Sequence, residues 1–182
     1  MAFAAVILAG GRATRLSGVD KVLIEVEGKS LLRRAVDAVT GAEPVIVVGP
    51  PRWQTGSVVW AREEPPGAGP LAGLAAGLAK LPPDTTEVAV LAADLLAVSL
   101  STVDKLRLAL WEAPDAAGAV LTDSEGRRQW LMGVWRPGPL GQALPPDPAG
   151  RSLRSVLGRL RLVDVPAMPG EEADLDTPDD LP

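Results

Sequence analysis

The sequence predicts an α/β fold with a mostly parallel β-sheet, and two patterns support that prediction. Short apolar runs indicate buried strands at residues 3–9, 44–49 and 87–94. They alternate with segments of helical periodicity, such as residues 30–39 and 101–113. This alternation is typical of a parallel sheet covered by helices. Ligands of such sheets bind beyond the carboxyl ends of the strands, so the site is expected there.

The remaining elements follow from the same patterns. Ser30 and Ser101 are the predicted N-caps of the two helices already named. The segment 123–129 is expected to turn the chain back between two strands. Further strands are predicted at residues 22–28 (a strand or a hairpin), 58–63, 116–123, 130–136 and 161–165, and further helices at residues 69–81 and 151–160. We expect one domain over residues 1–182.

The composition excludes several kinds of chemistry. The chain has 182 residues and contains neither cysteine nor histidine. Disulfides, thiolate zinc sites, cysteine nucleophiles and imidazole acid–base catalysis are therefore excluded. A metal site would depend on carboxylate and other oxygen ligands, which suit magnesium. A net charge of -5 argues against a nucleic-acid surface, and no apolar run is long enough to span a membrane, so we expect a cytoplasmic protein.

The strongest single feature is the glycine loop at residues 8–21, LAGGRATRLSGVDK. Glycines directly after a buried strand allow backbone N–H groups to approach phosphate oxygens. Arg12, Arg15 and Lys21 add positive charge. The loop has neither the spacing of a dinucleotide-binding fold nor that of a P-loop. From the residues alone, a glycine turn with solvated basic side chains explains the loop equally well.

Two further segments are candidates for the same site. Asp94 ends an apolar strand, where a carboxylate is well placed for magnesium, although an aspartate that caps a turn is an equal alternative. Small residues at 63–78 would allow a flat ring to approach the start of a helix. A helix packed behind a proline-rich entry also explains that segment. Asp94 and the glycine loop both lie at expected carboxyl ends of strands and would share a pocket.

Several motifs together resemble the sugar-nucleotide and molybdenum cofactor nucleotidyltransferases. Residues 8–21 resemble their loop LAGGxSxRMGxDK, and residues 63–78 resemble a Pro-Gly-x-Gly-Pro-Leu-Ala-Gly segment typical of the guanylyltransferase branch. Weaker matches follow in sequence order at residues 89–94, 127–136 and 174–181. This chain departs from the pattern at two places. Glu63, or secondarily Glu64, replaces an aspartate, and Leu96 replaces the proline that usually follows Asp94.

The resemblance implies the fold and the roles of particular residues. The fold would be a Rossmann-like three-layer α/β/α sandwich of the nucleotide-diphospho-sugar transferase type. Arg15, Lys21 and Asp94 would be catalytic. Asp94 and Asp176, with Asp174 as a weaker candidate, would hold Mg²⁺. The implied nucleotide-binding residues are Leu8, Ala9, Gly10, Gly11, Lys21, Gly49, Glu63, Gly69 and Asp94. Arg151 and Arg154 are acceptor-side candidates, although solvated helix charges explain them better.

The resemblance also implies the reaction. These enzymes join GMP from GTP to molybdopterin, or to its molybdenum-bound form, and release pyrophosphate. GTP and molybdopterin are the implied substrates, together with transient contact with molybdenum cofactor enzymes or their chaperones. Three alternatives stay open: a cytidylyltransferase acting on the same cofactor, a nucleotidyltransferase for a sugar phosphate or another small phosphorylated metabolite, and a non-catalytic nucleotide-binding or partner-binding module.

Overall fold

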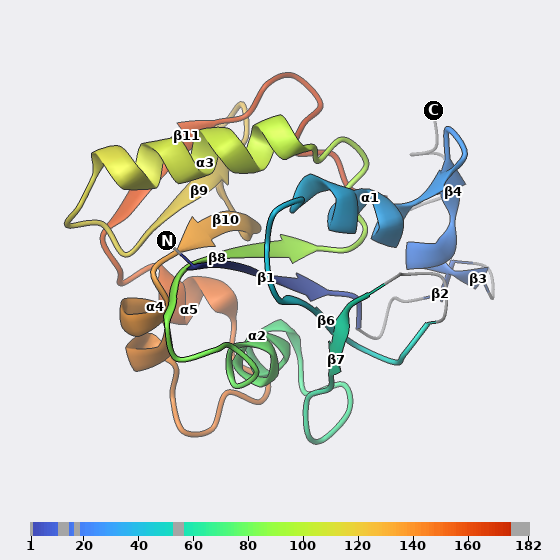
Figure 1. Ribbon diagram of the computed structural model, residues 1–182, viewed down its shortest axis with the longest axis horizontal. Coiled ribbons are helices and arrows are strands. Elements are labelled where there is room, and N and C mark those ends of the chain that lie inside the picture. Colours follow the sequence, from blue (N-terminus) through green and yellow to red (C-terminus); the bar gives the residue numbers. More distant parts are fainter. Residues whose placement is uncertain (1, 11–14, 17–18, 53–56, 176–182) are drawn as a thin grey trace.

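A seven-stranded sheet forms the middle layer of the molecule (Figure 1). The computed structural model describes residues 2–10, 15–16, 19–52 and 57–175. Across the sheet the strands are β11 (Leu162–Pro166), β9 (Gly118–Thr122), β10 (Arg128–Trp135), β8 (Thr85–Ala92), β1 (Ala2–Leu8), β6 (Val45–Val48) and β7 (Val59–Ala61). Only β10 runs antiparallel to its neighbours among these strands, so the predicted mostly parallel sheet is confirmed.

Helices cover both faces of the sheet and complete the predicted three-layer sandwich (Figure 1). One face carries α1 (Leu31–Ala38) and α3 (Leu100–Glu112), which pack against each other. The other carries α2 (Pro70–Leu78), α4 (Pro137–Ala143) and α5 (Leu153–Leu157). No helix in the described part of the chain has the length and apolar character needed to cross a membrane.

Alternation along β1 shows why a uniformly apolar run forms this central strand. Ala5 and Ile7 pack into the core beneath α1 and α3, whereas Val6 and Leu8 pack into the core beneath α2 and α4. Successive side chains of a strand point to opposite faces, so a strand buried on both faces needs apolar residues throughout. The same requirement explains the apolar runs of β6 and β8.

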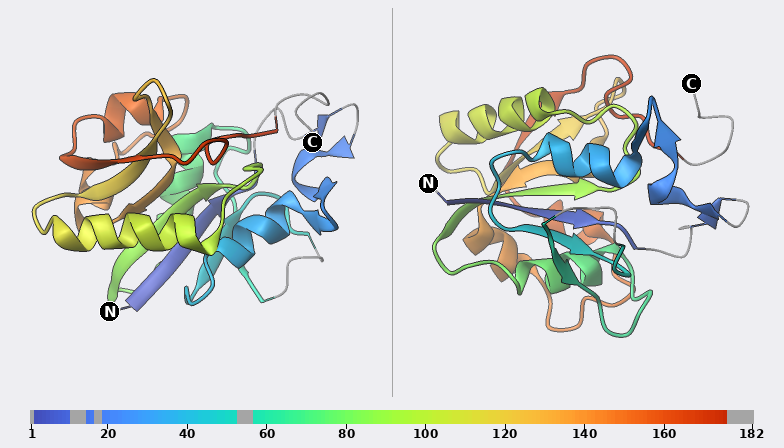
Figure 2. Two further views of the ribbon diagram at one scale, coloured as in Figure 1. Left: turned by 90° about the horizontal axis from the view of Figure 1, so that it is seen from above. Right: turned by 45° about the vertical axis from the view of Figure 1, so that its right-hand side comes forward.

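Small elements gather at one end of the sheet, where the arrowheads of β1 and β8 point (Figures 1 and 2). They are the hairpin of β2 (Arg15–Leu16) and β3 (Val19–Asp20), a 3₁₀ helix at Lys21–Leu23, and the hairpin of β4 (Glu25–Val26) and β5 (Lys29–Ser30). The second hairpin turns at Glu27 and Gly28, both with positive φ. The strand or hairpin expected at residues 22–28 is therefore a 3₁₀ turn followed by this hairpin.

The structure differs from the predicted helices at three places. Ser101 is not the cap of α3. The N-cap of α3 is Ser99. Its Oγ accepts the N–H of Thr102 at 3.4 Å, and Thr102 Oγ1 accepts the N–H of Ser99 at 3.3 Å. The helix expected at 151–160 shortens to α5, which is capped by Ser152 and ends before Gly158. Helix α4 was not predicted, because its prolines and glycines obscure the burial of Leu140.

Candidate functional site

The ends of β1, β6 and β8 are joined by backbone hydrogen bonds where the glycine loop begins. Ala9 N–H donates to Val48 O at 2.8 Å, and Ala93 N–H donates to Leu8 O at 3.0 Å. These bonds hold residues 8–10 against the loops that follow β6 and β8. The loop is thereby fixed at the carboxyl ends of three parallel strands, as expected for a ligand site in this class of sheet. Gly11 lies outside the described residues.

Gly49 allows the loop after β6 to approach the glycine loop. Its φ is 150°, and a Cβ placed there would lie 2.8 Å from the carbonyl oxygen of Ala9. Its N–H donates to Ala61 O at 2.9 Å, which fixes its position against β7. Glycine is therefore needed at 49 because the backbone of Ala9 occupies the space of a side chain. Gly49 shapes the site through its backbone.

A cavity of about 260 Å³ brings four of the predicted nucleotide-binding residues together. They are Leu8, Gly10, Glu63 and Gly69, and the remaining lining residues are Val48, Gly67, Pro70 and Gly73. Most of this wall consists of glycine and aliphatic carbon, with one carboxylate. Such a surface suits a flat heterocycle with a few polar edge groups. Ala9, also predicted, is buried in the core beneath the loop.

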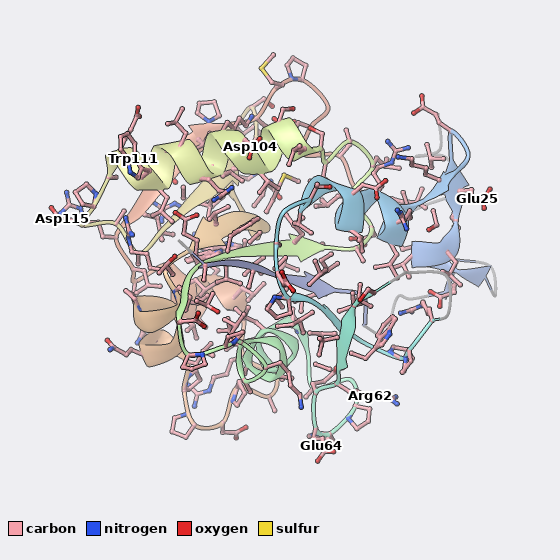
Figure 3. The ribbon with its side chains drawn as sticks, viewed as in Figure 1. Glu25, Arg62, Glu64, Asp104, Trp111 and Asp115 are labelled. Carbon is pink, nitrogen blue, oxygen red and sulfur yellow. The ribbon has the colours of Figure 1, made fainter. Side chains whose placement is uncertain are left out.

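Glu63 is the polar group of this cavity. Its side chain is 9% exposed, and Oε1 accepts the N–H of Gly67 at 3.0 Å. The neighbouring Glu64 is exposed and projects outward from the loop after β7, beside Arg62 (Figure 3). Of the two carboxylates considered from the sequence, Glu63 is therefore the one that faces a ligand cavity.

Lys21 and Asp94 form an ion pair between distant parts of the sequence. Lys21 Nζ lies 2.9 Å from Asp94 Oδ2, with the lysine side chain 6% exposed and the aspartate side chain 29% exposed. Lys21 belongs to the 3₁₀ turn, and Asp94 follows β8. The pair combines a positive charge with a partly exposed carboxylate at the mouth of the sheet, an arrangement that can handle phosphate and a hard cation. The side chain of Arg15 lies outside the described residues, so its role stays a prediction.

Arg52 is a buried part of the site that sequence reasoning missed. Its Nε and Nη2 donate to the two carboxylate oxygens of Asp20 at 2.8 and 3.1 Å, and Nη1 donates to Pro50 O at 3.0 Å. This bidentate pair connects the β2–β3 hairpin to the loop after β6, next to Lys21. The Asp20 of the glycine-loop motif is therefore a structural anchor. A lone arginine in a proline-rich stretch gave no signal of this contact.

The segment leading to the C-terminus runs beside Asp94. Leu95 forms a β-bridge with Asp174, Leu96 N–H donates to Ala173 O at 2.9 Å, and Leu175 N–H donates to Asp94 O at 3.1 Å. A second cavity of about 310 Å³ opens here. It is lined by Ala92, Asp94, Leu95, Gln129, Trp130, Leu131, Met132, Leu153, Glu172 and Asp174. Asp94 and Asp174, 80 residues apart in sequence, thus border one cavity.

The donor set at this point fits magnesium. Asp94 and Asp174 line this cavity with carboxylate side chains, and Asp176, the predicted second ligand, lies outside the described residues. Within the described ranges, no group of three or more acidic side chains is arranged to hold a metal ion by itself. Magnesium bound with a nucleotide commonly takes only one or two carboxylates, together with phosphate oxygens and waters. The residues present therefore match that mode of binding.

The acceptor-side arginines lie elsewhere on the surface. Arg151 and Arg154 are exposed, and Arg154 borders a separate cavity of about 580 Å³ with Arg127, Arg128, Arg159 and Trp130. Arg127 pairs with Asp123 and Arg128 with Asp164. Trp130 lines both this basic cavity and the cavity beside Asp94. The structure therefore does not bring Arg154 to the Lys21–Asp94 pair.

Glu171 anchors the segment that carries Asp174. Lys105 Nζ donates to Glu171 Oε2 at 2.5 Å, Met168 N–H donates to the same oxygen at 2.8 Å, and the hydroxyl of Thr102 donates to Oε1. Burial by itself would raise the pKa of Glu171, but these hydrogen bonds outweigh it and hold the pKa below its ordinary value of 4.5. The ionised carboxylate is therefore the form that attaches this segment to α3.

This anchor predicts acid sensitivity. A carboxyl whose pKa is lower in the folded state stabilises the fold above its unfolded pKa, and the effect is lost as pH falls through the folded value. We expect Glu171→Gln to cost about 1–3 kcal/mol at pH 7, and progressively less as pH falls below 4.5 and then through the folded pKa of Glu171. Denaturant unfolding of wild type and variant between pH 3 and 7 measures this difference. A cost that is the same at every pH would contradict the assignment.

Comparisons with known proteins agree with this geometry. Residues 5–165 match the MobA-like NTP transferase domain. A probable molybdenum cofactor guanylyltransferase of Natronomonas pharaonis is 31% identical over 147 residues, which cover 76% of this chain and 70% of that protein. A molybdenum cofactor guanylyltransferase of Vibrio cholerae is 37% identical over 83 residues, 43% of this chain and 41% of that protein.

A solved structure shows the same fold. Molybdopterin-guanine dinucleotide biosynthesis protein A from Archaeoglobus fulgidus superimposes with a TM-score of 0.71 and 19% identity, covering 97% of this chain and 94% of that one. The α/β sandwich, the glycine-walled cavity and the family match together define a nucleotidyltransferase. The chain belongs to the MobA-like NTP transferase family.

Proposed function

We propose that this protein is a molybdenum cofactor guanylyltransferase, which transfers GMP from GTP to the phosphate of molybdopterin or of its molybdenum-bound form. The observation that carries the proposal is the Lys21–Asp94 pair at the carboxyl ends of the strands. A cavity with Glu63 lies at the glycine loop, and a second cavity has Asp94 in its own wall. A two-substrate transferase needs this arrangement, with one pocket for the donor and one for the acceptor.

The proposed reaction is an in-line displacement at the α-phosphorus of GTP. A phosphate oxygen of the acceptor forms the new bond to the α-phosphorus, the bond from that phosphorus to the bridging oxygen breaks, and pyrophosphate leaves. The acceptor oxygen is already an anion at neutral pH, so a chain without histidine can support this step. Lys21 and Arg15 would stabilise charge on the phosphates, and backbone N–H groups of the glycine loop would orient them.

Magnesium is part of the proposal. Asp94, with Asp174 or Asp176, would hold the ion. When bound, Mg²⁺ would neutralise charge on the triphosphate and so favour the departure of pyrophosphate. We place the reaction in the cytoplasm, with transient contact with molybdenum cofactor enzymes or their chaperones that take up the product.

The first test is the choice of nucleotide. Calorimetry with GTP, CTP, ATP and UTP, with and without Mg²⁺, should give selective, magnesium-dependent binding of GTP. Release of pyrophosphate in the presence of molybdopterin should follow. Preference for CTP would instead favour the cytidylyltransferase, and a failure to bind any nucleotide would favour a non-catalytic module.

Glu63 provides a sharper test of the donor pocket. In this proposal its carboxylate would accept N–H groups from the edge of guanine, so Glu63→Gln should weaken GTP binding by about 10- to 100-fold. The exposed neighbour provides the matched control, and Glu64→Gln should bind GTP as the wild type does. Equal GTP affinity in wild type and Glu63→Gln would remove Glu63 from base recognition.

A further inference from the structure

One residue that lines the cavity beside Asp94 has a polar atom that the proposed catalysis does not use. Oε2 of Glu172 is buried and lacks a hydrogen-bond partner among the described residues. Glu172 lines this cavity, whereas the other two such atoms in the described part of the chain belong to Arg34 and Trp135, which do not. Burying a carboxylate oxygen without a donor is unfavourable. The side chain has to turn this oxygen toward the cavity before an N–H donor of a ligand there can reach it and relieve that cost.

The walls of the cavity indicate which ligand would bring such a donor. Trp130 presents an aromatic surface, and Leu131, Met132 and Leu153 are apolar. A volume of about 310 Å³ suits a planar bicyclic ring. No lysine or arginine is among the described residues that line this cavity, so the carboxylate of Glu172 has no cation there to neutralise it.

The chemistry of Glu172 repeats that of Glu63 in the donor cavity. Guanine and pterin share a 2-amino-4-oxopyrimidine ring, whose edge presents two adjacent N–H donors. A carboxylate can accept both of them side by side. The terminal torsion of a glutamate side chain is broad, so the carboxylate of Glu172 can turn an oxygen toward the cavity. Each of the two cavities therefore has a glutamate able to recognise this edge, and the cavity beside Asp94 is also lined by Asp94 and Asp174.

We propose that Glu172 is a specificity-determining residue that recognises the 2-amino-4-oxopyrimidine edge of the acceptor, whose ring lies against Trp130. Asp174, two residues further on, is paired with Leu95 beside Asp94. The same segment thus contributes two residues to the cavity wall, of which Glu172 would contact the ring and Asp174 would lie toward the reacting phosphate. The inference rests on the proposed function in one respect, namely that the acceptor is a pterin.

The experiment measures binding of a pterin without any nucleotide. The probe is 6-hydroxymethylpterin, and its partner is 6-hydroxymethyllumazine, in which an oxo group replaces the 2-amino group. Wild type should bind the pterin about 10- to 100-fold more tightly than the lumazine. Glu172→Gln should lose most of this discrimination and keep its GTP affinity. Glu112→Gln, at the exposed end of α3, is the matched control and should behave as wild type.

The outcomes separate this inference from the proposed function. Equal binding of pterin and lumazine by the wild type would overturn the role of Glu172, even if GTP remains the preferred nucleotide. Loss of GTP binding in Glu172→Gln, with pterin binding intact, would mean that Glu172 recognises guanine and not the pterin. That result would also overturn the inference. Pterin discrimination that depends on Glu172 in a protein that prefers CTP would support the inference and refute the guanylyl donor.

Discussion

Replacing Asp94 by asparagine should lower turnover by about a thousandfold or more, because the site then loses a magnesium ligand and the partner of Lys21. Asparagine keeps the shape of the side chain and removes its charge. Pyrophosphate release, measured with saturating nucleotide, acceptor and Mg²⁺, reports the loss. Turnover within about tenfold of the wild type would exclude Asp94 as a metal ligand.

The same substitution should also affect stability. Lys21 Nζ is deeply buried and 2.9 Å from Asp94, so the variant leaves a buried ammonium group with a weaker partner. We expect a cost of about 1–3 kcal/mol, small enough for the protein to stay folded. Thermal unfolding of Asp94→Asn and of Asp104→Asn separates this cost from a general effect of lost charge. Asp104 is an exposed residue of α3 (Figure 3), and its variant should match wild type.

Gly49→Ala should cause the largest loss of stability among the substitutions considered. Its new Cβ would lie 2.8 Å from Ala9 O and 3.0 Å from Ala9 C, and its φ of 150° is unfavourable for alanine. These backbone atoms are fixed by the sheet, so the glycine loop must move. We expect a cost of about 2–4 kcal/mol and, at the same time, weaker nucleotide binding.

A second glycine separates the effect of the contact with Ala9 from the effect of the unfavourable φ. Gly41 has a φ of 91°, but a Cβ there would meet no atom within 4 Å. Gly41→Ala therefore tests backbone strain alone, with an expected cost of about 1 kcal/mol and unchanged nucleotide binding. Thermal unfolding and calorimetry on both variants provide the comparison. Equal losses would mean that the close approach of Gly49 to Ala9 does not restrict the loop.

Much of the fold could be predicted because the strands are buried on both faces. Apolar runs such as β1 and residues 88–92 of β8 have few other uses in a chain of this composition. Helix ends were harder to predict. Serines stand at both 99 and 101, and only the reciprocal bonds with Thr102 identify Ser99 as the cap. In α4 the local propensity of proline and glycine opposes a helix, and burial of Leu140 outweighs it.

Part of the candidate site could likewise be predicted from the sequence, and part could not. By itself, the sequence determined the order of the main strands and of every helix except α4, the glycine loop, and the candidacy of Lys21, Glu63 and Asp94, because each stands at the end of a recognisable pattern. Only the tertiary structure decided that Lys21 pairs with Asp94, that Arg52 donates hydrogen bonds to Asp20, and that Glu172 lines the cavity beside Asp94. The physical reason is that these contacts join segments far apart in the chain. Their partners are selected by the packing of the sheet and its loops, which no local pattern of residues records.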